Sequence, residues 1–166
     1  MSEKAMVIED QKIVYEGPFS VRDLYKTIRE LLVEKGYVFF ERKIHEAVGS
    51  KGKTIEGTFE PFKKFNDYAK GIIRLNLTIT DCKEVELKKG GRTVKLNTGR
   101  VHIAIDAFLE TDYEHRWEKH PVLYVIRTLF EKYVFVPHIS GFTAQVNDDV
   151  RHLRDNIKAF LNLYKM

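Results

Sequence analysis

A long run of strand signals between Tyr37 and residue 113 constrains the fold of this chain more than any other feature. In two stretches, residues 68–80 and 100–113, apolar and polar residues alternate, which is the period of a strand with one buried face. No stretch with helical spacing interrupts this run. Consecutive strands joined by tight turns pair antiparallel, so a parallel sheet with helices between its strands is disfavoured.

The same pattern places the individual strands. Residues 12–16 predict a short first strand, and further strands are expected over 37–48, 54–59, 68–80 and 100–113, with a loop at 61–67. Apolar residues at 85, 87, 94 and 96 flank Lys89-Gly90-Gly91-Arg92, which predicts a hairpin with a glycine-rich turn. The buried face of the two alternating stretches is expected to hold Ile73, Leu75, Leu77, Ile79, Val101, Ile103, Ile105, Ala107 and Leu109.

Helical spacing occurs in three segments. The first runs from Ser20 to Lys35, where Ser20 is a suitable N-cap and Gly36 a suitable stop. Two more helices are predicted after the strands, one over residues 121–135 that ends at Val136-Pro137 and one after Ser140-Gly141. The expected fold is therefore α+β: a twisted antiparallel sheet of six or seven strands with one N-terminal and two C-terminal helices packed on it.

Length and composition bound the class of protein. A chain of 166 residues with 43% hydrophobic residues predicts a single globular domain over 1–166, in which residues 1–10 are frayed. No apolar run reaches the roughly 18 residues of a spanning helix, and the N-terminus lacks a secretory signal, so we expect a soluble, cytoplasmic protein. Many lysine, glutamate and arginine residues suit a thermophile, and the single Cys82 excludes an internal disulfide.

This order of elements resembles that of the helix-grip, or START-like, superfamily. In that superfamily a first strand, a helical segment, a six-stranded antiparallel run and a long C-terminal helix enclose a cavity. The resemblance covers most of the chain and rests on element order, without a sequence motif. It implies a cavity between the sheet and the last helix that takes a small apolar ligand. The predicted helix at 121–135 departs from the superfamily's pattern.

The outward faces of residues 68–80 and 100–112 carry the candidates for a polar ligand pocket: Arg74, Asn76, Arg100, His102 and Asp106. If a helix covers this face, these groups line a pocket, and His102 with Asp106 becomes a candidate acid–base pair for catalysis. If the face is open to water, they form an ordinary solvated surface, which is the outcome that alternation predicts.

Basic residues gather around the predicted hairpin and are the candidates for nucleic-acid binding: Lys88, Lys89, Arg92 and Lys95. A basic hairpin can follow a phosphate backbone. However, Glu84 and Glu86 interrupt the cluster, and no aromatic residues stand between the basic ones to stack on bases. Lysine also protects exposed strand edges, so we expect little nucleic-acid binding.

Motifs for the common enzyme chemistries are missing from the sequence: it has no Gly-x-Ser-x-Gly elbow, no Walker loop and no Gly-x-Gly-x-x-Gly. His115 and His120 are five residues apart, whereas a helical metal pair needs i,i+3 or i,i+4 spacing. We therefore predict no metal site and no cofactor. The leading hypothesis is a non-enzymatic binding or interaction module; the alternatives are a helix-grip domain that binds a small apolar ligand and a nucleic-acid-binding accessory protein.

Overall fold

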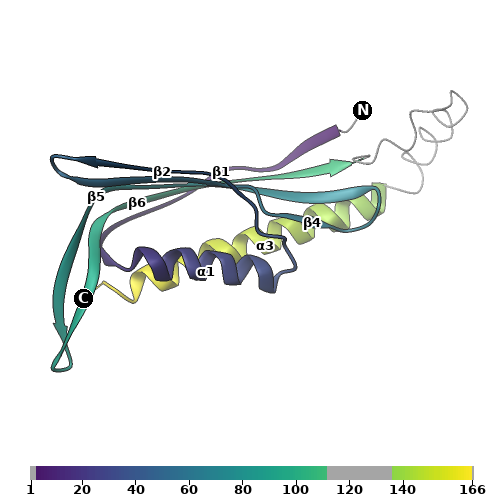
Figure 1. Cartoon of the computed structure of the whole chain (residues 1–166). Helices are drawn as coiled ribbons and strands as arrows, with labels where there is room; N and C mark the ends of the chain where they lie inside the picture. Colours follow the sequence, from purple (N-terminus) through teal and green to yellow (C-terminus); the bar gives the residue numbers. More distant parts are fainter. Residues whose placement is uncertain (1–2, 112–135, 166) are drawn as a thin grey trace, which may run out of the picture.

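A computed structural model describes residues 3–111 and 136–165 of the chain. Its elements are β1 (Glu3–Phe19), α1 (Val21–Glu34), β2 (Glu41–Gly49), β3 (Gly52–Phe59), β4 (Phe62–Lys64), β5 (Ala69–Lys89), β6 (Arg92–Thr111) and α3 (Val136–Asn162). Figure 1 shows that α1 and α3 both lie on the same side of a single sheet. The predicted helix at 121–135 lies outside the described residues.

Within the described residues the sheet has six antiparallel strands, in the order β1-β6-β5-β3-β2, with β4 paired to β5 beside this path. The strands β5 and β6 form one long hairpin, which runs from the pair Ala69 and Thr111 to the pair Lys89 and Arg92. Between them, Gly90 and Gly91 have φ values of 58° and 77°. A two-residue type I′ turn requires positive φ at both positions, so the predicted hairpin and its turn are confirmed.

The hydrophobic core lies between the sheet and the two helices. All nine residues predicted for the buried face of β5 and β6 are buried, the most exposed being Leu77 at 5%. Helix α1 adds Leu24, Ile28 and Leu32 to this core. Helix α3 adds Val146, Val150, Leu153, Ile157 and Leu161. The layer between the sheet and α3 is therefore filled by a continuous apolar cluster.

Helix α1 begins and ends where its sequence predicts. The Ser20 hydroxyl accepts a hydrogen bond from the backbone N–H of Asp23 at 3.2 Å, which satisfies one of the donors left free at a helix start. Gly36, with φ of 83°, turns the chain out of the helix.

Several predicted boundaries are wrong. Residues 3–10 belong to β1 rather than to a frayed end, because β6 extends far enough for Glu3 to pair with Thr111. Strand β2 begins at Glu41 rather than at Tyr37, and Val38 makes only an isolated bridge to Phe62. Helix α3 begins at Val136, where the sequence predicted a break, because proline is tolerated in the first turn of a helix.

The long hairpin bends where a bulge interrupts β5. The pairing shifts between Thr80 and Lys83, and Asp81 within this bulge has a φ of 54°. Beyond the bend, β3 no longer pairs with β5. Toward the tip of the hairpin, the pairing of β6 with β1 stops at Asn97. Residues 83–97 are here named the arm, and beyond the pair Glu84 and Asn97 they form a ribbon of only two strands. In Figure 1 the arm turns from the plane of the sheet toward the helix side.

Candidate functional site

The two faces of the sheet differ in what covers them. The inner face packs against α1 and α3, whereas no helix lies on the opposite, outer face in the part of the chain that Figure 1 draws as ribbon. The five predicted pocket residues alternate with buried residues of β5 and β6, so they share this outer face. The structure thus brings them to one face, but among residues 3–111 and 136–165 no helix completes a pocket over them.

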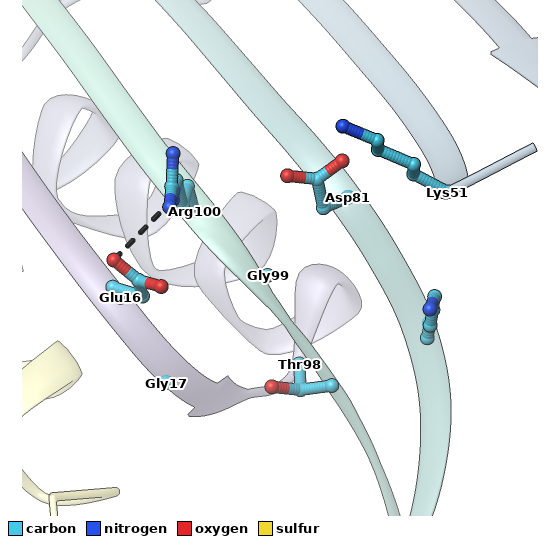
Figure 2. A pocket seen from close by; sticks show the side chains of 8 residues that line it. Glu16, Gly17, Lys51, Asp81, Thr98, Gly99 and Arg100 are labelled. Atoms are coloured by element: carbon cyan, nitrogen blue, oxygen red, sulfur yellow. Dashed lines mark ion pairs between the residues drawn. The ribbon is translucent and has the colours of Figure 1, made fainter. Parts of the chain in front are cut away.

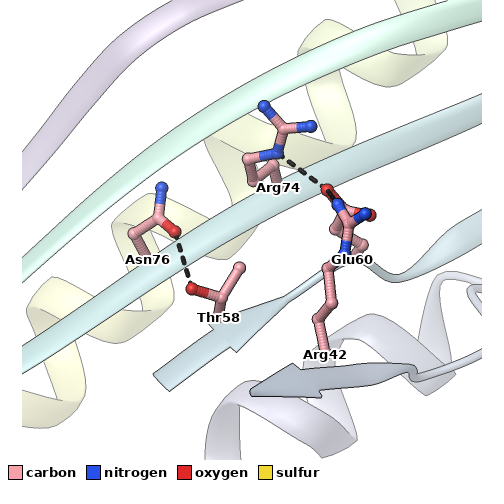
Figure 3. A network of polar contacts seen from close by, with 5 residues as sticks. All are labelled: Arg42, Thr58, Glu60, Arg74 and Asn76. Carbon is pink, nitrogen blue, oxygen red and sulfur yellow. Dashed lines mark hydrogen bonds and ion pairs between the residues drawn. The ribbon is translucent and has the colours of Figure 1, made fainter. Parts of the chain in front are cut away.

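Two of these predicted residues belong to a network of polar contacts that crosses neighbouring strands (Figure 3). Arg74 Nε donates to Glu60 Oε1 at 2.8 Å, and Arg42 Nη1 donates to the same oxygen at 2.7 Å. The Thr58 hydroxyl donates to Asn76 Oδ1 at 3.1 Å. These side chains form hydrogen bonds with one another, so the network holds β2, β3 and β5 together.

The electrostatics of Glu60 follow from this network. Partial burial by itself would raise the pKa of the carboxyl group, but the hydrogen bonds and charges of Arg74 and Arg42 outweigh burial and hold the pKa below its ordinary value. The Arg74 guanidinium also lies over the ring of Phe108, with 5.1 Å to the ring centroid. Glu60 is therefore a charged, paired group at neutral pH.

The predicted acid–base pair is not formed. His102 and Asp106 lie four residues apart on β6, which is about 13 Å along a strand. His102 is exposed and stands in register with Val14 and Thr78. Asp106 accepts a hydrogen bond from the backbone N–H of Asp10 at 2.8 Å. Alternation places residues on a common face but does not bring them within proton-transfer distance, which is why this pairing fails.

Arg100, the remaining pocket candidate, lines a hollow at the foot of the arm (Figure 2). The hollow has a volume of about 540 Å³ and is lined by Glu16, Gly17, Lys51, Asp81, Lys83, Thr98, Gly99 and Arg100. Arg100 Nε lies 3.3 Å from Glu16 Oε2. The bend of the hairpin gathers these residues from β1, β5, β6 and the turn after β2. No spacing in the sequence signals such a meeting, so only Arg100 was found in advance.

A second hollow, of about 330 Å³, lies at the other end of the outer face. Its lining consists of Lys4, Phe40, Glu60, Phe62, Lys70, Ile72 and Glu110. Lys70 Nζ lies 2.9 Å from Glu110 Oε2, and Lys70 also stands 5.8 Å from the centroid of the Phe62 ring. Two of the charged groups of this hollow, Lys70 and Glu110, are therefore engaged with each other.

The two faces of the arm have different chemistry. Lys83 and Thr98 line the outer hollow, and alternation from them places the opposed pairs Val85–Leu96 and Leu87–Val94 on the outer face. Arg92 follows Val94 on the same face at the tip. Asn97 points to the helix side, where its Oδ1 accepts a hydrogen bond from the backbone N–H of Val21 at 3.3 Å. The inner face therefore holds Glu84, Glu86, Lys88, Thr93, Lys95 and Asn97.

This division corrects the predicted nucleic-acid cluster. Lys88 and Lys95 lie on the inner face, whereas Arg92 lies on the outer face, and Lys89 pairs with Arg92 beside the turn. Lys95 Nζ is also 4.0 Å from Glu86 Oε1. The four residues are neighbours in sequence but do not form one continuous basic patch, because consecutive residues of a strand point to opposite faces.

The arm nevertheless carries most of the net charge of the chain. It has five basic and two acidic residues, a balance of +3, in a chain whose formal net charge is +4. Both acidic residues, Glu84 and Glu86, are on the inner face with Lys88 and Lys95. The outer face of the arm thus combines basic and aliphatic side chains without a carboxylate.

No protein-family model matches this chain, and no curated protein matches it in sequence. Neither α1 nor α3 has the length and apolar character that a helix needs to cross a membrane.

Proposed function

We propose that this protein is a non-enzymatic binding module that contacts its partner through the outer face of the arm and the hollow at its foot. The observation that carries the proposal is that the arm takes no part in the core. Along β5 the last residue of the core cluster is Cys82, directly before the arm, and the cluster includes no residue of the arm. A two-stranded ribbon alone in water is marginally stable, and ordering it costs conformational entropy. A contact with a partner accounts for an arm that contributes nothing to the core.

The remaining polar groups of the outer face support a binding role over catalysis. Arg74, Glu60 and Arg42 are engaged with one another, and His102 is too far from Asp106 for direct proton transfer. Such paired side chains stabilise a surface and leave no activated nucleophile or base.

The small-ligand alternative depends on a cavity between the sheet and α3. Large side chains occupy that layer from both sides: Leu75 and Ile105 of the sheet are 0% exposed, and Leu153 of the helix is 2% exposed. A filled core of this kind favours an interaction protein over a domain that encloses an apolar ligand. The nucleic-acid alternative is weakened by the division of its four candidate residues between two faces of the arm.

Removal of the arm tests the proposal. A variant in which an Asn-Gly turn replaces residues 85–96 would join Glu84 to Asn97, which already stand opposite each other. We expect the shortened protein to retain its circular dichroism spectrum and a cooperative thermal transition at or above the parent midpoint. Loss of the cooperative transition would show that the arm is needed for folding, and the proposal would fail.

A further inference from the structure

We infer that the outer face of the arm binds the surface of an anionic lipid bilayer. The inference rests on the proposed function, since it names the partner of the same face. Four aliphatic residues form two directly opposed pairs in the middle of the arm, and Val94 among them is 40% exposed. Lys83 stands at one end of this aliphatic group and Arg92 at the other.

The hollow extends this surface toward the body of the protein. Lys51, Lys83 and Arg100 line it together with the carboxylates of Glu16 and Asp81, so its lining holds three basic and two acidic side chains. Glu16 is engaged by Arg100 at 3.3 Å. The outer surface therefore carries a small excess of positive charge at the foot of the arm and Arg92 at its tip, with the aliphatic residues between them.

A complementary partner must offer apolar surface and negative charge within one contact. Nucleic-acid phosphates supply only the charge, and a second copy of this face would oppose basic groups to basic groups. The interface of an anionic bilayer supplies both, since aliphatic side chains enter the boundary of the acyl chains while lysine and arginine remain at the headgroup phosphates.

The shape of the molecule permits such a contact. Because the arm turns toward the helix side, its outer face points away from the sheet and from both helices (Figure 1).

The arm also contains its own matched control. Replacement of Lys83 and Arg92 by Gln removes two positive charges from the outer face, and replacement of Lys88 and Lys95 by Gln removes the same charge from the inner face. Neither pair belongs to the core cluster, so both variants should fold as the parent does. Any difference between them then reports which face makes the contact.

The test measures binding to vesicles of phosphatidylcholine with about one third phosphatidylserine, by sedimentation at low salt, with pure phosphatidylcholine vesicles as the neutral probe. We expect the parent to bind only the anionic vesicles. At about fivefold in affinity for each basic residue, the Lys83→Gln, Arg92→Gln variant should lose about 25-fold, and the Lys88→Gln, Lys95→Gln variant should bind nearly as the parent does. A Leu87→Ser, Val94→Ser variant should lose the binding that remains at high salt.

Other results would overturn the inference. No binding to the anionic vesicles would exclude the bilayer, and binding of duplex DNA alone would assign the arm to nucleic acid. Equal losses from the two glutamine pairs would indicate attraction by net charge without a defined face. Because these assays use the full, folded chain, a negative result removes the lipid partner only, whereas unfolding of the shortened variant would remove the proposed function itself.

Discussion

The bend at the foot of the arm depends on close packing of backbone against Gly99, and replacement of this residue by alanine tests it. A Cβ atom at Gly99 would lie 2.8 Å from the carbonyl oxygen of Thr80 and 3.2 Å from the Cα of Cys82. It would also lie 3.4 Å from the carbonyl carbon of Asp81. All three atoms belong to the backbone of the β5 bulge, so rotation of a side chain cannot relieve the contact.

The expected cost of Gly99→Ala follows from this geometry. Overpacking of a well-packed site typically costs about 1–3 kcal/mol, and we expect the upper part of this range because two paired strands must separate. The free energy of unfolding is measured by urea titration with far-ultraviolet circular dichroism as the signal.

Gly141→Ala is the matched control for this measurement. Gly141 lies in α3, and a Cβ atom there would meet no neighbouring atom within 4 Å. Alanine at this position should therefore stabilise the protein by about 0.5–1 kcal/mol through its higher helix propensity. If Gly99→Ala is as stable as the parent while Gly141→Ala gains stability, the reasoning about the tight bulge is refuted.

Three further predictions concern the core and the outer face. Leu75→Asp should abolish the cooperative thermal transition, because Leu75 is 0% exposed and a carboxylate would enter the core; a transition near the parent midpoint would contradict the register. Phe160 is only partly buried, so Phe160→Ala should cost about 2 kcal/mol by urea titration. A loss of about 3–5 kcal/mol, as for a fully buried phenylalanine, would contradict its position. Glu60→Gln should cost about 1 kcal/mol at neutral pH. Because the pKa of Glu60 in the folded protein is lowered from 4.5, this contribution is present above that pH and is lost as the pH falls through the folded-state value. Unfolding midpoints of both proteins should therefore converge in acid, and a difference that persists there would argue against the ion pairs.

Local sequence was sufficient to predict the elements that turn one apolar face toward the core. The apolar spacing of α1, its Ser20 cap and Gly36 stop predicted the helix to within a residue or two at each end. Alternation in β5 and β6 predicted the correct buried face, and Gly90-Gly91 predicted the turn that joins them. These features follow from the chain's own periodicity and from the φ values that glycine allows.

Tertiary structure decided the extent of the elements at their ends. Residues 3–10 have no strong strand signal of their own and are held in β1 by pairing with the far part of β6. The buried position of Asp149 in α3 also depends on residues far away in the sequence. It is buried where Tyr37 Oη donates to it at 3.2 Å and Lys63 Nζ lies 3.5 Å away. Partners so far apart in the sequence leave no local signal.

The features of the candidate site also divide into those that the sequence predicted and those that only the tertiary structure showed. The sequence by itself determined which residues of β5 and β6 face outward and that basic residues gather near the turn. Only the tertiary structure showed that His102 and Asp106 are separated, that the basic residues lie on two faces, and that a bulge at Asp81 creates a hollow. The physical reason is that a strand's period fixes the face of each side chain, whereas distances across a sheet depend on register, bulges and neighbouring strands, which long-range pairing sets.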